Sequence, residues 1–204
     1  MRIAIFALAF ALASLSLPAF AQSGSGGKPL NIRGTVDKLE GDKLTVNTRE
    51  GSKASVKLDP KVAVSYPEKK SLADIKTGDF IACTSVKGAD GKLHALEVHL
   101  FPAGRHPREV QRPYDLAPGS LMTNATVGQV TATSQGGKTL TVTEKGHTSV
   151  IEIGSDVPVV MAVPGDKSLL KPGAFVFIAA VKKDDGSMTT SRITAEKNGV
   201  KPPM

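Results

Sequence analysis

Glu97, His99 and His106 are the residues of this chain best suited to bind a metal ion. Glu97 and His99 are two positions apart, so in a strand their side chains point to the same side. Carboxylate and imidazole groups together favour zinc, nickel or copper(II). Glu109 or Asp115 could fold back from the following segment as a further ligand. This pattern supports one hypothesis, a site for a divalent transition metal at Glu97, His99 and His106.

Other features of the sequence favour ordinary surface histidines at these positions. The second half of the chain has Arg192 and Thr194 where the first half has Glu97 and His99, and it offers no His-x-x-x-His spacing or cysteine pair. His94 is expected on the opposite strand face from His99 unless the strand twists or bulges. Motifs of hydrolases, nucleotide-binding loops and zinc proteases are also missing, so we expect no enzyme activity and no cofactor.

The segment 102–122 is rich in proline and arginine, which predicts an extended connection rather than a helix. One interpretation is a simple spacer. The other is that Arg108, Arg112, Tyr114 and Asp115 dock on a domain of this chain or on a partner, because arginine and tyrosine are frequent interface anchors.

Cys83 is the only cysteine of the chain, so an intrachain disulfide is excluded. It stands among apolar residues in an expected strand, which favours a small buried side chain over a redox thiol. In the same strand Phe80 alternates with Ala82 and Thr84, and Phe175 occupies the corresponding place in the second half. We therefore expect Phe80 and Phe175 to be core residues.

The composition argues against nucleic-acid binding. The 204 residues include seven Phe, two Tyr and no Trp, which is few for a protein that stacks bases on aromatic rings. The formal net charge is +7, but acidic and basic residues alternate along the chain and form no basic block.

The first residues have the order of a secretory signal peptide, with Arg2, an apolar run and the motif Ala19-Phe20-Ala21. We expect cleavage after Ala21 and a periplasmic or secreted protein. The apolar run is shorter than the roughly 20 residues of a membrane-spanning helix, so the mature chain is not expected to span a membrane.

An internal repeat with a period near 95 residues organises the rest of the chain. Leu44-Thr45-Val46 matches Leu140-Thr141-Val142, Phe80 matches Phe175, and Asp90-Gly91 matches Asp185-Gly186. The same comparison aligns Gly34 with Gly128 and Val36 with Val130. Each copy has β-branched runs separated by turns. The expected strands of the first copy are 32–38, 43–48, 52–58, 80–87 and 93–100.

Between the third and fourth strands of the first copy, Ser71 and Asp74 predict one capped helical turn. The order of three strands, a turn and two strands fits a small OB-like barrel. We therefore expect an all-β protein with two tandem OB-like β-barrels of five or six strands each, after a cleaved signal peptide. The predicted organisation is a signal peptide (1–21), a flexible leader (22–29), a first barrel (30–101), a linker (102–122), a second barrel (123–197) and a tail (198–204).

The pattern carried by Gly34-Thr35-Val36, Leu44-Thr45-Val46, Ile75 to Phe80 and Asp90-Gly91 resembles the exported bacterial domain of unknown function numbered 5666. The resemblance covers about residues 32–100 and, less closely, 126–195. More distantly, the chain is similar to periplasmic OB-fold stress-tolerance proteins. These resemblances imply an OB-like barrel and export, and they imply no established activity.

Together these features predict an exported, non-enzymatic binding or interaction module of the periplasm with a role in envelope stress. Its partner would be a protein or a small ligand. The alternative is a periplasmic metal-handling protein that uses Glu97, His99 and His106.

Overall fold

The structure is a computed structural model that describes residues 27–202, and the predicted signal peptide and most of the leader lie outside these residues. The described part is all-β, as predicted, with twelve strands and two single-turn 3-10 segments. The elements are β1 (Lys28–Glu40), β2 (Lys43–Thr48), β3 (Lys53–Lys70), η1 (Leu72–Asp74), β4 (Phe80–Lys87), β5 (Leu93–Leu100), β6 (Val110–Pro113), β7 (Leu121–Ala132), β8 (Lys138–Glu144), β9 (His147–Ile153), β10 (Val159–Pro164), η2 (Lys167–Leu169), β11 (Phe175–Lys182) and β12 (Met188–Ala195).

Five strands close into a barrel, which we call the first ring. β1 pairs with β2 and β11, β2 pairs with β3, β11 pairs with β12, and β12 closes the ring by pairing in parallel with β3. Its interior is one hydrophobic core. The residues of this first core are Ile32, Val36, Leu44, Val46, Ala54, Val56, Leu58, Val64, Leu170, Val176, Ile178, Ala180, Ile193 and Ala195.

A second ring of five strands forms in the same way. β4 pairs with β5 and β7, β7 with β8, and β8 with β9, while a short parallel contact between β5 and β9 closes the ring. The second core is separate from the first. It contains Ile75, Ile81, Cys83, Ala95, Val98, Leu100, Ala125, Val127, Leu140, Val142, Ile151, Ile153 and Val159.

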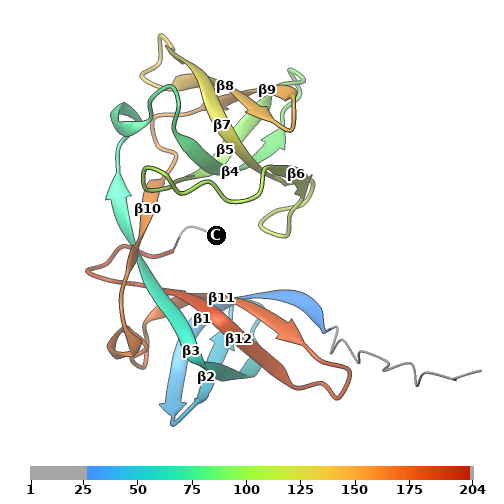
Figure 1. The fold of residues 1–204 in the computed structure, drawn as a ribbon, viewed down its shortest axis with the longest axis vertical. Helices are drawn as coiled ribbons and strands as arrows, with labels where there is room; N and C mark the ends of the chain where they lie inside the picture. The colour runs from blue at the N-terminus through green and yellow to red at the C-terminus, as the bar shows by residue number, and fades with distance from the viewer. Residues whose placement is uncertain (1–26, 203–204) are drawn as a thin grey trace, which may run out of the picture.

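Each ring therefore combines strands from both halves of the chain. The first ring takes β1 to β3 from the first half and β11 and β12 from the second, and the second ring takes β4 and β5 from the first half and β7 to β9 from the second. The expected tandem arrangement, with barrels over 30–101 and 123–197, is not confirmed, because the two segments exchange their last two strands. Figure 1 shows the two rings at opposite ends of the molecule, connected by the long β3 and by β10.

The exchange repeats one backbone contact in both rings. Val36 of β1 bonds through its backbone to Gly173 and Ala174, just before β11, and Val127 of β7 bonds in the same way to Gly78 and Asp79, just before β4. Val36 pairs with Val46, and Val127 pairs with Val142. In the structure the counterpart of Val36 is thus Val127, three residues before the Val130 expected from sequence. The loop between β7 and β8 is longer than the loop between β1 and β2, which absorbs the shift.

The predicted helical turn is present as η1. The backbone N–H and the hydroxyl of Ser71 both donate to Asp74 Oδ2, at 2.7 and 2.8 Å. This arrangement turns the chain sharply after β3, so that β4 starts in the second ring.

The expectation that Phe80 and Phe175 are core residues is confirmed in part. Phe80 is a buried hydrophobic residue, whereas Phe175 is only partly buried. The faces of their strands that point into the two ring cores carry Ile81 and Val176 instead. Phe80 is still 3% exposed, because residues of the linker cover the outer face of β4, and its ring lies 5.7 Å from that of Phe101. The strand alternation was correct, but both faces of β4 are buried, so apolar residues alone did not reveal which face points inward.

The candidate functional site between the rings

Glu97 is positioned by an irregularity in β5. Ala95 pairs with Ser85 and Glu97 pairs with Thr84, so Leu96 has no partner on β4 and forms a bulge. A bulge reverses the alternation of side chains along a strand. Ala95 therefore points into the second core, whereas Glu97 lies on the outer face.

His99 shares the outer face of β5 with Glu97, as the sequence predicted. The histidine Nε2 lies 3.8 Å from Glu97 Oε2. Because of the bulge, His94 also lies on this side of the strand, since its neighbours Leu93 and Ala95 pack toward the core. His94 does not reach Glu97 and instead contacts Asp90.

The carboxylate of Glu97 is buried and only half satisfied. Its side chain is 3% exposed. Oε1 accepts a 2.7 Å hydrogen bond from the hydroxyl of Thr84, but Oε2 has no hydrogen-bond partner among the residues that the structure describes. A buried carboxylate oxygen without a partner costs free energy, and natural proteins seldom keep one without a reason.

Glu97 and His99 line a cavity of about 150 Å³, which we call the inter-ring cavity. It lies between the outer faces of β4 and β5 in the second ring and of β11 and β12 in the first. Its walls are mostly apolar. The lining residues are Ala82, Glu97, His99, Phe101, Tyr114, Met122, Phe177, Thr194 and Pro202.

A neighbouring cavity of about 350 Å³ shares Phe101, Phe177 and Thr194 with the inter-ring cavity. It extends along the junction of the rings toward Arg105 and Arg192, which are both exposed. The two cavities are thus neighbours along the junction of the rings, and Glu97 lines only the smaller one.

The C-terminal segment forms part of this site. It was expected to be a tail, but Pro202 is buried and lines the inter-ring cavity. Lys197 lies 3.7 Å from the centroid of the Tyr66 ring, and Lys201 lies 5.7 Å from that of Phe175. These cation–π contacts hold the segment against the first ring.

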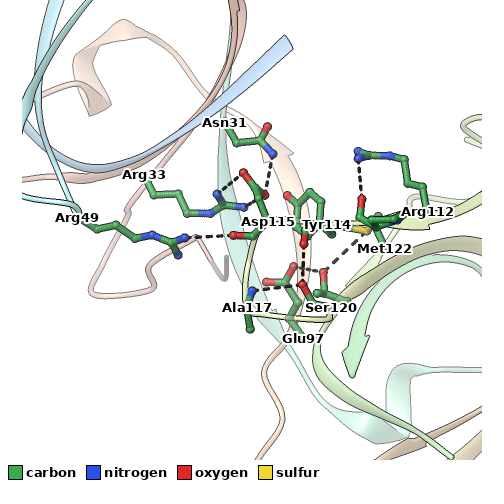
Figure 2. A network of polar contacts seen from close by, with 12 residues as sticks. Asn31, Arg33, Arg49, Glu97, Arg112, Tyr114, Asp115, Ala117, Ser120 and Met122 are labelled. Carbon is green, nitrogen blue, oxygen red and sulfur yellow. Dashed lines mark hydrogen bonds and ion pairs between the residues drawn. The ribbon is translucent and has the colours of Figure 1, made fainter. Parts of the chain in front are cut away.

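The linker is attached to the first ring through a buried arginine. Arg33 is 3% exposed and forms a two-pronged ion pair with Asp115, with N–O distances of 2.8 and 3.0 Å. The side chain of Asn31 donates to the same carboxylate, and the guanidinium of Arg49 donates to the backbone oxygen of Asp115. Figure 2 shows this network beside Tyr114 and Glu97.

Aromatic rings enclose the guanidinium of Arg33. Its central carbon lies 5.4 Å from the centroid of Tyr114 and 5.2 Å from that of Phe177, which is its direct partner across β1 and β11. Arg112 stacks on Tyr114 at 5.4 Å. Tyr114 thus lies between two arginines and forms one wall of the inter-ring cavity.

The electrostatics of this network follow from burial and pairing. Burial alone would lower the pKa of Arg33, but its hydrogen bonds to Asp115 and the surrounding negative charges raise the pKa overall. The hydrogen bond from Arg33 lowers the pKa of Asp115. Burial raises the pKa of Tyr114, although the charge of Arg33 opposes this effect. Arg33 and Asp115 therefore stay charged and pair with each other. Two buried atoms of this region, Arg33 Nε and Glu97 Oε2, have no hydrogen-bond partner within the described residues, and the charge of Glu97 contributes to the raised pKa of Arg33.

The structure brings together only two of the three candidate metal ligands. Glu97 and His99 are adjacent, whereas His106 is exposed and its ring packs on Phe80 at 5.2 Å. Glu109 accepts a hydrogen bond from the backbone of Lys145 and is thereby directed elsewhere.

Within residues 27–202, one group of three side chains converges closely enough to share a metal ion: Asp90, His94 and Glu152. Lys92 already forms an ion pair with Glu152, so this partly exposed group has its own counterion.

The four candidate interaction residues have different environments. Asp115 and Tyr114 pack against the first ring as described, and Arg112 stacks on Tyr114. Arg108 contributes its backbone oxygen, which accepts from the side chain of Asn124, and its side chain is exposed. The linker contains the short strand β6, which pairs with β7.

Sequence reasoning missed most of the residues that line the site, among them Phe177 and Pro202, and it also missed Arg33 beside it. Arg33 left one weak signal, since it stands between Ile32 and Gly34 in the part of β1 that is buried. Cys83 was interpreted correctly as a buried side chain, since it is 0% exposed in the second core and burial raises the pKa of its thiol.

No family model, curated protein or solved structure matches this chain. Within residues 27–202, no helix has the length and apolar character needed to cross a membrane.

Proposed function

We propose that this protein is an exported, non-enzymatic binding module whose ligand site is the inter-ring cavity. One observation carries the proposal: Glu97 is 2% exposed, lines a mostly apolar cavity and has no hydrogen-bond partner for Oε2 within residues 27–202. A pocket with apolar walls and a few placed polar groups is the usual form of a small-molecule site.

Several contacts support a site that is formed before the ligand arrives. The Arg33–Asp115 ion pair fixes the linker against the first ring, and Tyr114 is held between two arginines. A rigid pocket loses little conformational entropy on binding, which favours affinity. We also propose that the two rings are versions of one OB-like barrel that have exchanged their last two strands.

The proposal can be tested by filling the cavity. Ala82 lines the cavity and is 9% exposed, so Ala82→Leu would occupy much of the space. Ala132 is exposed at the end of β7 and is no part of the cavity lining, so Ala132→Leu is the matched control. The probes are neutral, cationic and anionic compounds of about five to eight non-hydrogen atoms, since a cavity near 150 Å³ holds a molecule like benzene.

We expect at least one probe to raise the melting temperature of the mature chain and of Ala132→Leu, with no effect on Ala82→Leu. Binding to a preformed site stabilises the folded state by mass action, which makes the melting temperature a direct readout. A panel in which no probe stabilises the protein, or in which Ala82→Leu responds like the control, would overturn the proposal.

A second candidate function is the binding of a divalent transition metal at the same place. The supporting observation is the 3.8 Å separation of Glu97 Oε2 and His99 Nε2, with the thioether of Met122 also in the cavity lining. Elemental analysis of the purified protein tests this candidate. Stoichiometric zinc, nickel or copper that disappears in His99→Ala would support it, and a metal-free protein that also fails to take up these ions would exclude it.

The proposed location is the periplasm or the exterior, after cleavage behind Ala21, and the proposed setting is envelope stress. The residues of the signal lie outside the described structure, so this part depends on the sequence and on the resemblance alone. Fractionation of cells that produce the chain tests it. A full-length chain that remains in the cytoplasm would refute export.

A further inference from the structure

We propose that the ligand of the inter-ring cavity is a small organic amine, bound as its ammonium ion by Glu97 Oε2. This inference rests on the proposed function and specifies the chemical class of the ligand.

The charge balance around the cavity favours a cation. The two terminal nitrogens of Arg33 are paired with Asp115, so this arginine already has its counterion. Its Nε has no hydrogen-bond partner within residues 27–202, but Arg33 is not among the residues that line the inter-ring cavity. Glu97 Oε1 is occupied by Thr84, whereas Oε2 is free. An ionised carboxylate accepts hydrogen bonds and donates none, so the missing partner is a donor. His99 at 3.8 Å is too distant to supply a good hydrogen bond.

The rest of the lining fits the organic part of an amine. Phe101, Phe177 and Tyr114 present aromatic rings, which accommodate alkyl or aryl groups and attract positive charge. Met122 adds a polarizable apolar contact. A cavity of about 150 Å³ has room for an ammonium group and one compact apolar substituent, and it excludes long polyamines.

Other ligand classes fit less well. An anion would lie beside the buried negative charge of Glu97, which is strongly unfavourable. A neutral alcohol could donate one hydrogen bond to Oε2, but it would leave the charge unpaired. An ammonium ion satisfies both requirements, and a charge-assisted hydrogen bond of this kind should favour the amine over its alcohol by about 10- to 100-fold.

The experiment compares three probes that share one shape: benzylamine, benzyl alcohol and benzoate. Isobutylamine serves as a smaller second amine. Their dissociation constants are measured by calorimetry with the mature chain, with Glu97→Gln and with Glu152→Gln. The first variant keeps an oxygen that can accept from Thr84 and removes the charge. The second removes a carboxylate outside the cavity, on β9, and is the control.

We expect an amine to bind the wild-type chain and Glu152→Gln at least about 10-fold more tightly than benzyl alcohol, with no binding of benzoate. In Glu97→Gln this preference should disappear, while the affinity for benzyl alcohol changes by less than about 2-fold. Circular dichroism spectra that match the wild type would show that Glu97→Gln folds.

The outcomes separate the two proposals. If benzyl alcohol binds as well as the amines, or if Glu97→Gln keeps the preference, the amine assignment fails and the cavity remains a binding site. If none of the probes binds the wild-type chain, the amine assignment fails, and the proposed function then depends on the wider panel tested with Ala82→Leu.

Discussion

Ile178→Ala tests the exchange of strands between the two halves of the chain. Ile178 is in β11, is 0% exposed and belongs to the first core. Most of that core comes from β1, β2 and β3, which are more than a hundred residues away in sequence. Truncation of a fully buried isoleucine leaves a cavity and costs about 2–5 kcal/mol, and we expect about 3 kcal/mol here because the surrounding core residues are fully packed.

Hydrogen exchange of single amides shows which strands lose stability. In the exchanged fold, Ile178→Ala should reduce the protection of backbone amides in β2, for example that of Val46. Since a tenfold change corresponds to 1.4 kcal/mol, a loss of about 3 kcal/mol should reduce this protection roughly 100-fold. The amide of Val142 in β8 should change little, since β8 packs in the other core. The reciprocal control is Ile81→Ala, which should weaken β8 and spare β2.

The pattern of protection decides between the two arrangements. If each half of the chain formed its own barrel, Ile178→Ala would weaken β8 and leave β2 unchanged, and this result would refute the exchange. Equally faster hydrogen exchange in β2 and β8 would refute the conclusion that the two cores unfold separately.

Three further changes test the fold and its attachments. A protease site inserted between Ala103 and Gly104, in an exposed turn, should allow cleavage of the chain into two fragments. Because each ring contains strands of both fragments, they should still elute together in size-exclusion chromatography. Fragments that separate without denaturant would contradict the exchange. Gly34→Ala should destabilise the protein by about 3 kcal/mol or more in urea unfolding, because the new Cβ would lie 2.1 Å from the backbone oxygen of Asn47. Gly128→Ala, with 3.4 Å to its nearest atom, is the milder control and should cost less than about 1 kcal/mol. Asp115→Asn should cost about 1–2 kcal/mol at pH 7, since it leaves a buried arginine without its counterion while the aspartate itself is 49% exposed. Pairing with Arg33 lowers the pKa of Asp115 below 3.8. The stabilisation from the ion pair is therefore present above pH 3.8 and is lost as the pH falls through the lowered pKa. In urea unfolding, the difference in stability between wild type and Asp115→Asn should shrink in acid.

The strands were largely predictable from sequence, because β-branched runs and turn glycines are local signals. The expected strands 43–48, 80–87 and 93–100 coincide with β2, β4 and β5. The third strand was expected to end at Leu58 but continues to Lys70. The continuation includes Pro60, which lies where β3 has no partner on β12, since the pairing skips from Leu58 to Ala63.

The pairing of the strands was not predictable, because the two halves are alike. β4 and β5 have the same apolar pattern as β11 and β12, so either pair can complete either set of three strands. Which pair completes which ring depends on the direction in which β3 leaves the first ring. β3 continues straight into an antiparallel ladder with β10. Such a long-range contact has no signature in a local pattern.

The candidate site was predictable only where it depends on local spacing. Glu97 and His99 share a face because they are two residues apart, as expected. The bulge at Leu96 and the approach of Phe177 depend on pairing with other strands, so neither could be read from the spacing. His106 was placed wrongly because the linker turns its ring onto Phe80 instead of toward β5.

The exchange also explains why a ligand site can exist between the rings. In a tandem arrangement, the linker 102–122 would be the only covalent connection, and the orientation of two such domains is usually variable. Here β3 and β10 cross from one ring to the other as a hydrogen-bonded pair, from Val159 with Lys70 to Pro164 with Ser65. The walls of the inter-ring cavity, which come from β4 and β5 on one side and from β11 and β12 on the other, are therefore held at a fixed distance before any ligand binds. Because preorganisation reduces the cost of binding, a substitution that loosens the exchange should weaken the affinity for an amine even when it is remote from Glu97.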